Sequence, residues 1–223
     1  MSSETTAPSA MATQSIATTT ITTIMVDSPL PPAIITTRRL LIRPLHPKDA
    51  PAMQLHGSPA SVARYMSLAF PHPYTITHAD TWISLNLTSP YHHFAICEIA
   101  APHILIGGIG YKPGSDVEAH TGEVGYWIGE PFTGKGYVTE ALEALTAWTF
   151  TERGDRVRRL YAGVFGGHTA SMRCLEKCGY KAEGVLKGHV EKHGEVMDLH
   201  VFGLTKGDWE EWRRKREQEG SNN

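Results

Sequence analysis

A strand, a glycine-rich loop and a helix follow one another near the middle of this chain, and they constrain its fold most strongly. Residues 123–128 (Glu-Val-Gly-Tyr-Trp-Ile) predict a short strand, and residues 137–152 place apolar side chains at helical spacing. The loop between them contains Gly134-Lys135-Gly136. Glycines let the backbone approach a ligand closely, and N–H groups at a helix N-terminus favour negative charge. The segment therefore predicts an anion cradle suited to a pyrophosphate, with Lys135 adding a cation.

Two other phosphate-binding loops fit this segment poorly. A Rossmann turn needs a third glycine and an acidic residue about 20 positions further on, and a Walker loop needs Ser or Thr directly after its lysine. Here Gly136 follows Lys135. For the loop alone, an ordinary helix start with two turn glycines remains an alternative.

The predicted elements on either side of the loop indicate an α+β fold with a mixed sheet. Strands are expected at residues 34–43, 93–100, 104–111, 123–128, 159–165, 180–190 and 195–204. Helices are expected at residues 46–56, 78–87, 137–152, 169–178 and 206–219, with a short one after Ser58-Pro59. Ser58 and Thr77 are the expected N-caps of the helices that follow them.

The length of 223 residues allows one domain of ordinary size with tails. Residues 1–33 are rich in Ser, Thr, Ala and Pro and contain no Lys or Arg, so we expect a disordered tail. Residues 34–206 are expected to form the folded domain, and residues 207–223 a charged C-terminal helix and tail.

The formal net charge of −2 argues against a general nucleic-acid or membrane-surface binder, because such proteins usually carry a basic excess. No apolar run reaches the ~20 residues of a membrane span, and the N-terminus lacks the features of a secretory signal. We expect a cytoplasmic protein, with the nucleus as an alternative. It is expected to be a monomer or homodimer without nucleic-acid or membrane partners.

The cysteines Cys97, Cys174 and Cys178 are too few for a disulfide framework. Cys174 and Cys178 share a face of a predicted helix, but a structural zinc site needs about four ligands and no second pair is present. Two small buried thiols are expected. His189 and His193 lie on a predicted strand and turn, where a spacing of four does not bring two rings together, so no metal is expected.

Five segments of the chain carry a resemblance to a known family. They are residues 37–43 (Thr-Arg-Arg-Leu-Leu-Ile-Arg), 122–128, 133–142, 169–180 and 194–200. In this order they resemble the first strand, the fourth strand, the motif A loop, the motif B helix and the last hairpin of the GNAT superfamily of N-acetyltransferases. The branch with the ribosomal-protein N-terminal-alanine acetyltransferases is the most similar. The resemblance extends over residues 36 to about 210.

The resemblance implies a fold and an activity. The fold would be a GNAT-like mixed, mostly antiparallel twisted sheet flanked by helices, with a splay between the fourth and fifth strands. The activity would be transfer of an acetyl group from acetyl-CoA, as co-substrate, to a primary amine of a protein N-terminus or small molecule, by direct attack in a ternary complex. Acceptor specificity would lie in residues 46–90 and in the last hairpin.

The resemblance also implies which residues bind the co-substrate. Backbone groups of Trp127 and Ile128 would hold the pantetheine, and an N–H near Ile128 would stabilise the oxyanion. His168 takes the place of the usual motif B Asn beside the pantetheine or amine, with an ordinary histidine at a helix start as the alternative. The phosphates would be bound by N–H groups of the loop and the first helical turn, namely Gly134, Lys135, Gly136, Tyr137, Val138 and Thr139.

Two side chains are candidate catalytic groups. Glu123, on the fourth strand upstream of the acetyl site, is the candidate base, acting directly or through water. A solvated or ion-paired strand residue is the alternative. Ser171 is the candidate proton donor or hydrogen-bond partner for the departing thiolate; many GNAT enzymes use a motif B Tyr for this, and the matching position here is Leu175. A helix serine bonded to its own backbone is the alternative.

Departures from the family pattern keep two rival functions open. Pro131 replaces the usual Gln or Arg, Thr133 replaces the usual aromatic residue, and His168 replaces Asn. These changes motivate an acetyl-CoA-binding module with weak or no catalysis. A nucleotide-binding protein that uses the same loop is the other rival. The retained Glu123, Ser171 and glycine loop favour the enzyme.

Overall fold

Eight strands form one sheet in the part of the chain that the computed structural model describes, residues 27–154 and 156–221. From edge to edge the order is β1 (Ile35–Thr36), β2 (Leu40–Pro44), β3 (His93–Glu98), β4 (Leu105–Pro113), β5 (Thr121–Ile128), β6 (Arg159–Phe165), β8 (Glu195–Thr205) and β7 (Lys181–Lys192). Neighbouring strands are antiparallel except β5 and β6, which are parallel. The predicted mixed, mostly antiparallel sheet is confirmed.

The two parallel strands separate partway along their length. Their pairing runs from Thr121 opposite Arg159 to Glu123 opposite Tyr161. Beyond this point β5 continues to Ile128 without pairing to β6. β5 and β6 are the fourth and fifth predicted strands, so the expected splay is confirmed.

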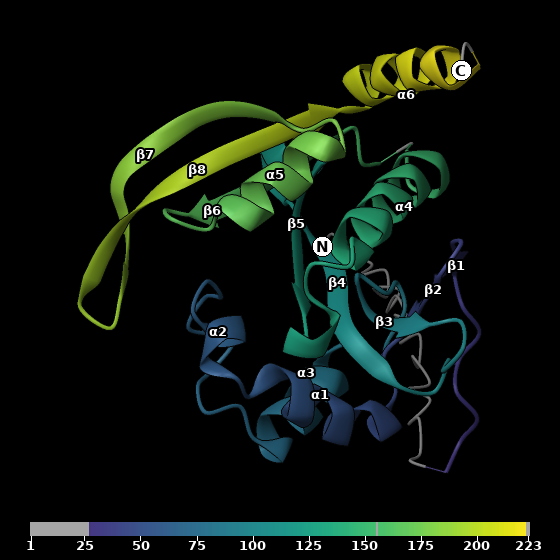
Figure 1. The fold of residues 1–223 in the computed structure, drawn as a ribbon, viewed down its shortest axis with the longest axis vertical. Coiled ribbons are helices and arrows are strands. Elements are labelled where there is room, and N and C mark those ends of the chain that lie inside the picture. The colour runs from purple at the N-terminus through teal and green to yellow at the C-terminus, as the bar shows by residue number, and fades with distance from the viewer. Residues whose placement is uncertain (1–26, 155, 222–223) are drawn as a thin grey trace, which may run out of the picture.

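Helices cover both faces of the sheet (Figure 1). The longer ones are α1 (Ala50–Gly57), α3 (Ile76–Leu85), α4 (Tyr137–Glu152), α5 (Thr169–Lys177) and α6 (Lys206–Ser221). The short ones are α2 (Ala60–Ala63) and the 3₁₀ turns η1 (Pro47–Asp49), η2 (Asp116–Glu118) and η3 (Glu130–Phe132). Helices α4 and α5 pack on one face, and α1 and α3 on the other.

Two apolar cores lie on opposite faces of the sheet, and β3 contributes to both. Phe94 and Ile96 belong to the core under α4, whereas Ala95 and Cys97 belong to the core under α1 and α3. Alternate residues of a strand point to opposite faces, so a strand buried on both sides must be apolar throughout. The sheet therefore separates two apolar cores, and helices cover each of them.

The structure corrects two predicted helix caps. Helix α3 has Thr75, not Thr77, as its N-cap, and the hydroxyl of Thr75 accepts the His78 N–H at 3.3 Å. Ser58 is not an N-cap but follows the end of α1, where its hydroxyl donates to the Tyr74 carbonyl at 2.8 Å. The Ser58 hydroxyl thus donates hydrogen bonds to carbonyl groups, whereas an N-cap side chain would accept them from N–H groups.

The predicted tail falls mostly outside the described residues. At the other end, α6 follows β8 directly, and its Trp209 is 4% exposed and packs against Phe150 with ring centroids 5.5 Å apart. Over residues 27–154 and 156–221, no helix has the length and apolar character needed to cross a membrane.

Candidate functional site

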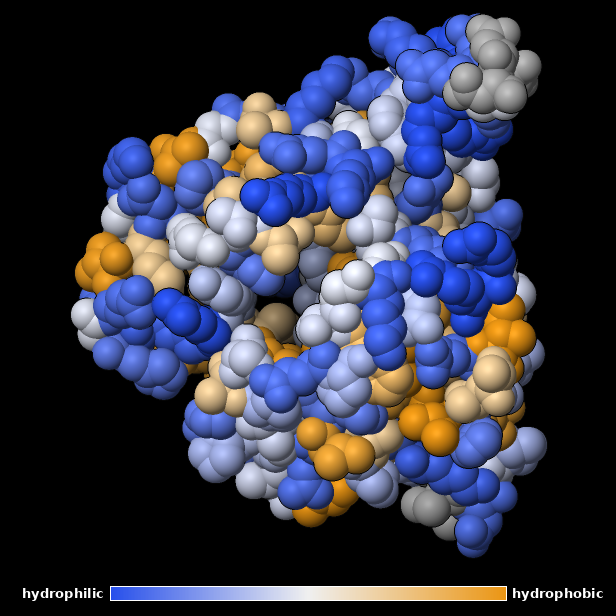
Figure 2. All heavy atoms as spheres, in the orientation of Figure 1, coloured by the Kyte–Doolittle hydropathy of each residue, from blue (hydrophilic) through white to orange (hydrophobic). Residues whose placement is uncertain are grey.

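A cavity of about 610 Å³, here named the cleft, opens where β5 and β6 separate. Its walls come from α2, the end of β5, the loop after it, the first turn of α4, and α5. The space-filling view is hollowed between α2 and α5 (Figure 2). The predicted site residues that line the cleft are Trp127, Ile128, Gly134, Gly136, Tyr137, Val138, Thr139, His168 and Ser171.

Helix α4 begins in the cleft without a side-chain cap. Its N-cap is Gly136, with φ at 75°, and Gly134 in the preceding loop has φ at 71°. Glycine adopts this left-handed conformation without steric cost. A Cβ at Gly134 would meet nothing within 4 Å, so the space beside the loop is open. The N–H groups of the first turn are therefore available to an anion.

Glu140, in the first turn of α4, ties the loop to the edge of the sheet. Its carboxylate accepts the Thr37 hydroxyl at 2.6 Å, the Arg39 N–H at 2.9 Å and Arg39 Nε at 2.7 Å. Arg39 Nη1 also donates to the Lys135 carbonyl at 2.9 Å. Burial raises the pKa of Glu140, but these hydrogen bonds and the Arg39 charge outweigh it and lower that pKa. The ionised carboxylate therefore holds the loop against Thr37 and Arg39 at the edge of the sheet.

The backbone edge of β5 faces the gap beyond the point where β6 leaves it. The Gly129 N–H donates to the Ile106 carbonyl on β4 at 2.9 Å. Because N–H and C=O directions alternate along a strand, Ile128 and Tyr126 turn their backbone groups toward the gap, and Trp127 turns its groups toward β4. The open edge is thus formed by Tyr126 and Ile128, not by Trp127 and Ile128 as predicted.

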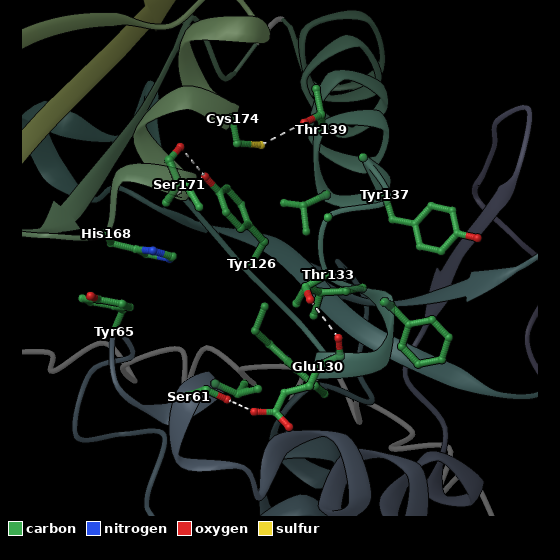
Figure 3. Close-up of a pocket in the computed structure, with 18 of the residues that line it drawn as sticks. Ser61, Tyr65, Tyr126, Glu130, Thr133, Tyr137, Thr139, His168, Ser171 and Cys174 are labelled. Carbon is green, nitrogen blue, oxygen red and sulfur yellow. Dashed lines mark hydrogen bonds between the residues drawn. The ribbon is translucent and has the colours of Figure 1, made fainter.

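Tyr126 and Ser171 form a connected pair of hydroxyl groups on the cleft wall (Figure 3). The Tyr126 Oη and Ser171 Oγ atoms are 2.8 Å apart, and either one can donate. Ser171 is 8% exposed, and burial raises the pKa of Tyr126. Both groups therefore remain protonated at neutral pH. The Ser171 hydroxyl bonds to a side chain across the cleft wall, which differs from the predicted alternative of a bond to its own backbone.

His168 and Tyr65 join the two sides of the cleft. Their rings stack with centroids 4.2 Å apart and an interplanar angle of 4° (Figure 3). His168 is the N-cap residue of α5, but its side chain makes no capping hydrogen bond. Burial lowers the pKa of His168, so its imidazole is neutral at pH 7. Nearby, the Ser61 hydroxyl of α2 donates to the Glu130 carboxylate.

Cys174 of α5 and Cys178, the residue that follows α5, both bond to Thr139 of α4. The Thr139 hydroxyl donates to Cys174 Sγ at 3.5 Å, and Cys178 Sγ donates to the Thr139 carbonyl at 3.5 Å. A hydrogen bond with Cys178 lowers the pKa of Cys174, which lines the cleft, to about 7. The predicted pair of buried thiols is confirmed. In the described ranges no three potential metal ligands gather in one place.

Two predicted residues do not line the cleft. Glu123 lies on β5 opposite Lys112 and Tyr161, where β5 still pairs with both neighbours. Lys135 is exposed, and its Nζ lies 5.3 Å from the centroid of the Phe132 ring. Glu123 could therefore exchange a proton with a ligand in the cleft only through another group or a water molecule. Lys135 could contribute only its positive charge, from outside the cleft.

A second cavity of about 450 Å³ adjoins the cleft. The two cavities share Met66, Tyr126 and Trp127 as lining residues. The rest of the second cavity is lined by α1, α3, the segment between α2 and α3, and β3 to β5. Much of it therefore comes from the region predicted to determine acceptor specificity.

Tyr126 and Tyr65 were missed as site residues. Tyr126 carried a usable signal, because it stands two residues before Ile128 and must share its face and edge of the strand. Tyr65 carried none, since it lies in an irregular segment and meets His168 only through the tertiary fold.

A family model and a solved structure both match this chain, and both are of GNAT acetyltransferases. Residues 39–181, more than half of the chain, match the family model described as an acetyltransferase (GNAT) domain. The crystal structure of a GNAT-family acetyltransferase from Bacillus anthracis superposes with a TM-score of 0.69 at 26% identity. The match covers 78% of this chain and 98% of that one.

Two curated relatives extend the comparison. An uncharacterized N-acetyltransferase, p20 of Bacillus licheniformis, is 28% identical over 178 residues, which cover 78% of this chain and 96% of that protein. The [ribosomal protein uS5]-alanine N-acetyltransferase of Escherichia coli is 31% identical over 90 residues, 40% of this chain and 45% of that protein. Both relatives are named as N-acetyltransferases, and the likeness to p20 extends over most of this chain.

Proposed function

The chain belongs to the GNAT family of acetyltransferases, and we propose that it transfers an acetyl group from acetyl-CoA directly to a primary amine in a ternary complex. The observation that carries this proposal is that one cleft joins the uncapped start of α4, the open edge of β5 and the Tyr126–Ser171 pair. These three features fit the pyrophosphate, the pantetheine and the thioester of a single extended ligand.

The proposed binding roles follow from the position of each group. N–H groups of Tyr137, Val138 and Thr139 at the start of α4 bind the phosphates, and the glycines keep the approach open. Backbone groups of Tyr126 and Ile128 pair with the pantetheine amides. The Ile128 N–H is the donor that polarises the thioester carbonyl and stabilises the oxyanion.

The Tyr126–Ser171 pair is the proposed proton source for the leaving group. As the amine nitrogen bonds to the carbonyl carbon, the carbon–sulfur bond breaks and leaves a thiolate. The Tyr126 hydroxyl donates its proton to this sulfur, and the tyrosine oxygen takes up the proton that the nitrogen loses as the amide forms. The neighbouring Ser171 hydroxyl holds the tyrosine oxygen by a hydrogen bond during this exchange. Tyr126 is thus the proposed proton donor, the role that was predicted for Ser171, and Ser171 positions the Tyr126 hydroxyl.

Glu123 is the proposed acceptor for the proton that the amine loses. An alkyl ammonium has a pKa of about 10, so it must be deprotonated before it attacks. Glu123 lies outside the cleft on the same strand as Tyr126. The proton therefore travels to Glu123 through water and not by direct contact.

The proposal is tested by ligand binding and by turnover. Acetyl-CoA and CoA should raise the melting temperature, whereas ATP and NAD should not, because only a true ligand stabilises by mass action. A thiol reagent should then detect CoA release that requires an amine. Stabilisation by ATP or NAD alone would overturn the proposal. Binding of acetyl-CoA without release on any amine would favour the binding module.

A further inference from the structure

The second cavity has an unusual chemical lining for a site that receives amines. None of the described residues that line it is Asp, Glu, Lys or Arg. Its lining is mainly aromatic and aliphatic, and the aromatic side chains on this face of the sheet are Phe70, Tyr74, His78, Trp82, His93 and Trp127. Phe94 and Tyr126 also border the cavity, but their side chains pack on the other face. A group with a second positive charge would lose its hydration there without meeting a carboxylate. The lining therefore favours an apolar body.

The aromatic side chains pack in two groups, which together form a wall of the cavity. Phe70 stacks on Tyr74 with centroids 4.5 Å apart and meets Trp127 at 5.8 Å. On the far side Trp82 meets His93 edge-on at 4.9 Å. Burial lowers the pKa of His93 to about 4, so this imidazole is uncharged at neutral pH. The wall offers ring faces and edges of the kind that pack against another ring.

Glycines form the floor of this cavity on the sheet. Gly108 of β4 and Gly125 of β5 both line it. A Cβ at Gly108 would lie 2.5 Å from Trp127 Nε1, so this glycine makes room for the indole. A Cβ at Gly125 would meet nothing within 4 Å, so the space above Gly125 is open to a ligand.

The shared wall places this space beside the proposed thioester site. Tyr126 and Trp127 line both cavities, and Tyr126 also carries the open edge of β5. A molecule seated over Gly125 would lie on the α1 and α3 face of the sheet, and its amine would meet the cleft at the open edge of β5. The cavity volume of about 450 Å³ falls in the range of small-molecule sites.

We propose that the acceptor is a small monoamine with an apolar, ring-sized body, which the aromatic cavity over Gly125 holds while its amine points to Tyr126. This inference rests on the proposed acetyl transfer and names its substrate class. Burying one ring in such a cavity is worth about 1.5–3 kcal/mol, which corresponds to roughly a tenfold to hundredfold preference over a short alkyl amine.

Turnover of four acceptors by the full chain tests the substrate class. The acceptors are 2-phenylethylamine, propylamine, spermidine and a peptide with an N-terminal alanine. We expect kcat/KM for 2-phenylethylamine to exceed that for propylamine by at least about tenfold. Equal values for these two amines, or a preference for spermidine or the peptide, would overturn the inference.

A matched pair of variants tests the location. Gly125→Leu fills the open space over the floor and should raise KM for 2-phenylethylamine about tenfold or more. Gly184→Leu is the control, because Gly184 on β7 also has open space and an ordinary φ but lies outside both cavities. Acetyl-CoA should stabilise both variants as it does the parent.

The outcomes separate the two proposals. Acetyl-CoA binding to Gly125→Leu shows that the fold and the cleft are intact, so an unchanged KM for 2-phenylethylamine would contradict the acceptor assignment alone. Acetyl-CoA binding to the parent chain without acetylation of any amine would also contradict it. Failure of acetyl-CoA to bind the parent chain would instead overturn the proposed function.

Discussion

Tyr126 and Ser171 are 45 positions apart in the chain and meet because β5 and α5 border the same gap. The motif B pattern pointed to Ser171 but not to its partner. A tyrosine on a strand next to a tryptophan is most simply explained as a packing residue. Tyr126 lines the cleft because β5 and β6 separate before they reach it.

Replacement of the tyrosine hydroxyl tests the proposed proton source. Tyr126→Phe should lower kcat on the order of 100-fold, because the thiolate then leaves without a proton donor. Tyr111→Phe removes a hydroxyl from the neighbouring strand outside the cleft and should leave kcat near the parent value. If steady-state CoA release shows equal kcat in both variants, the assignment to Tyr126 is wrong.

Glu123 is tested by the pH dependence of turnover. Glu123→Gln removes the proton acceptor, so activity should be lower and should be recovered only at higher pH, where more of the amine is already neutral. The measurement is kcat/KM against pH for parent and variant. An unchanged profile would leave Glu123 as an ordinary strand residue.

At the scale of elements, helix α4 was predicted with its bounds because its apolar period and its glycine loop give independent signals. The caps of α2 and α3 were mispredicted for different reasons. Two threonines near the start of α3 compete for its N-cap and Thr75 takes it, whereas α2 begins after Pro59 without a side-chain cap because Ser58 bonds at the end of α1. The contact that fixes the α4 loop, between Arg39 and Glu140, joins positions 101 residues apart and gives no local pattern.

The glycine loop is tested by two alanine substitutions of equal strain. Gly134 and Gly194 both have positive φ and open space at the Cβ position. Alanine at either position should cost about 1 kcal/mol of unfolding free energy. Only Gly134→Ala should also weaken the thermal stabilisation by acetyl-CoA, because Gly194 lies in the β7–β8 turn. Equal acetyl-CoA stabilisation in both variants would argue against phosphate binding at this loop.

At the scale of the whole molecule, one sheet separates two apolar cores, and two adjoining cavities share Met66, Tyr126 and Trp127 of the chain as lining residues. The sheet and the loop were predictable from local patterns and the family resemblance. The second cavity was not, because residues 66–85, which include Phe70 and Trp82, meet Gly125 of β5 only in the folded chain.

The pH dependence of stability tests whether His93, which lines the second cavity, is buried and neutral. Burial, with a smaller contribution from His92, lowers the pKa of His93 to about 4. In the unfolded chain a histidine takes up its proton near pH 6.5, whereas native His93 resists protonation until about pH 4. The contribution of His93 to the free energy of unfolding is therefore present above pH 6.5 and is lost as the pH falls toward 4.

The measurement is the urea midpoint at pH 7.5 and pH 5. It should be lower at pH 5 for the parent, and His93→Phe should reduce that difference. His103→Phe, in an exposed turn, is the control and should retain it. A pH dependence that is the same in both variants would contradict the buried, neutral state of His93.

Direct acetyl transfer in the cleft is the central claim, and mass spectrometry after a single turnover tests it most directly. The protein is incubated with acetyl-CoA, first alone and then with 2-phenylethylamine and the other amines, and the masses of protein and amine are measured. The account predicts that the protein mass stays unchanged in both steps, that CoA appears only when an amine is present, and that one amine gains one acetyl group. An acetyl group retained on the protein before any amine is added, and passed on afterwards, would contradict it.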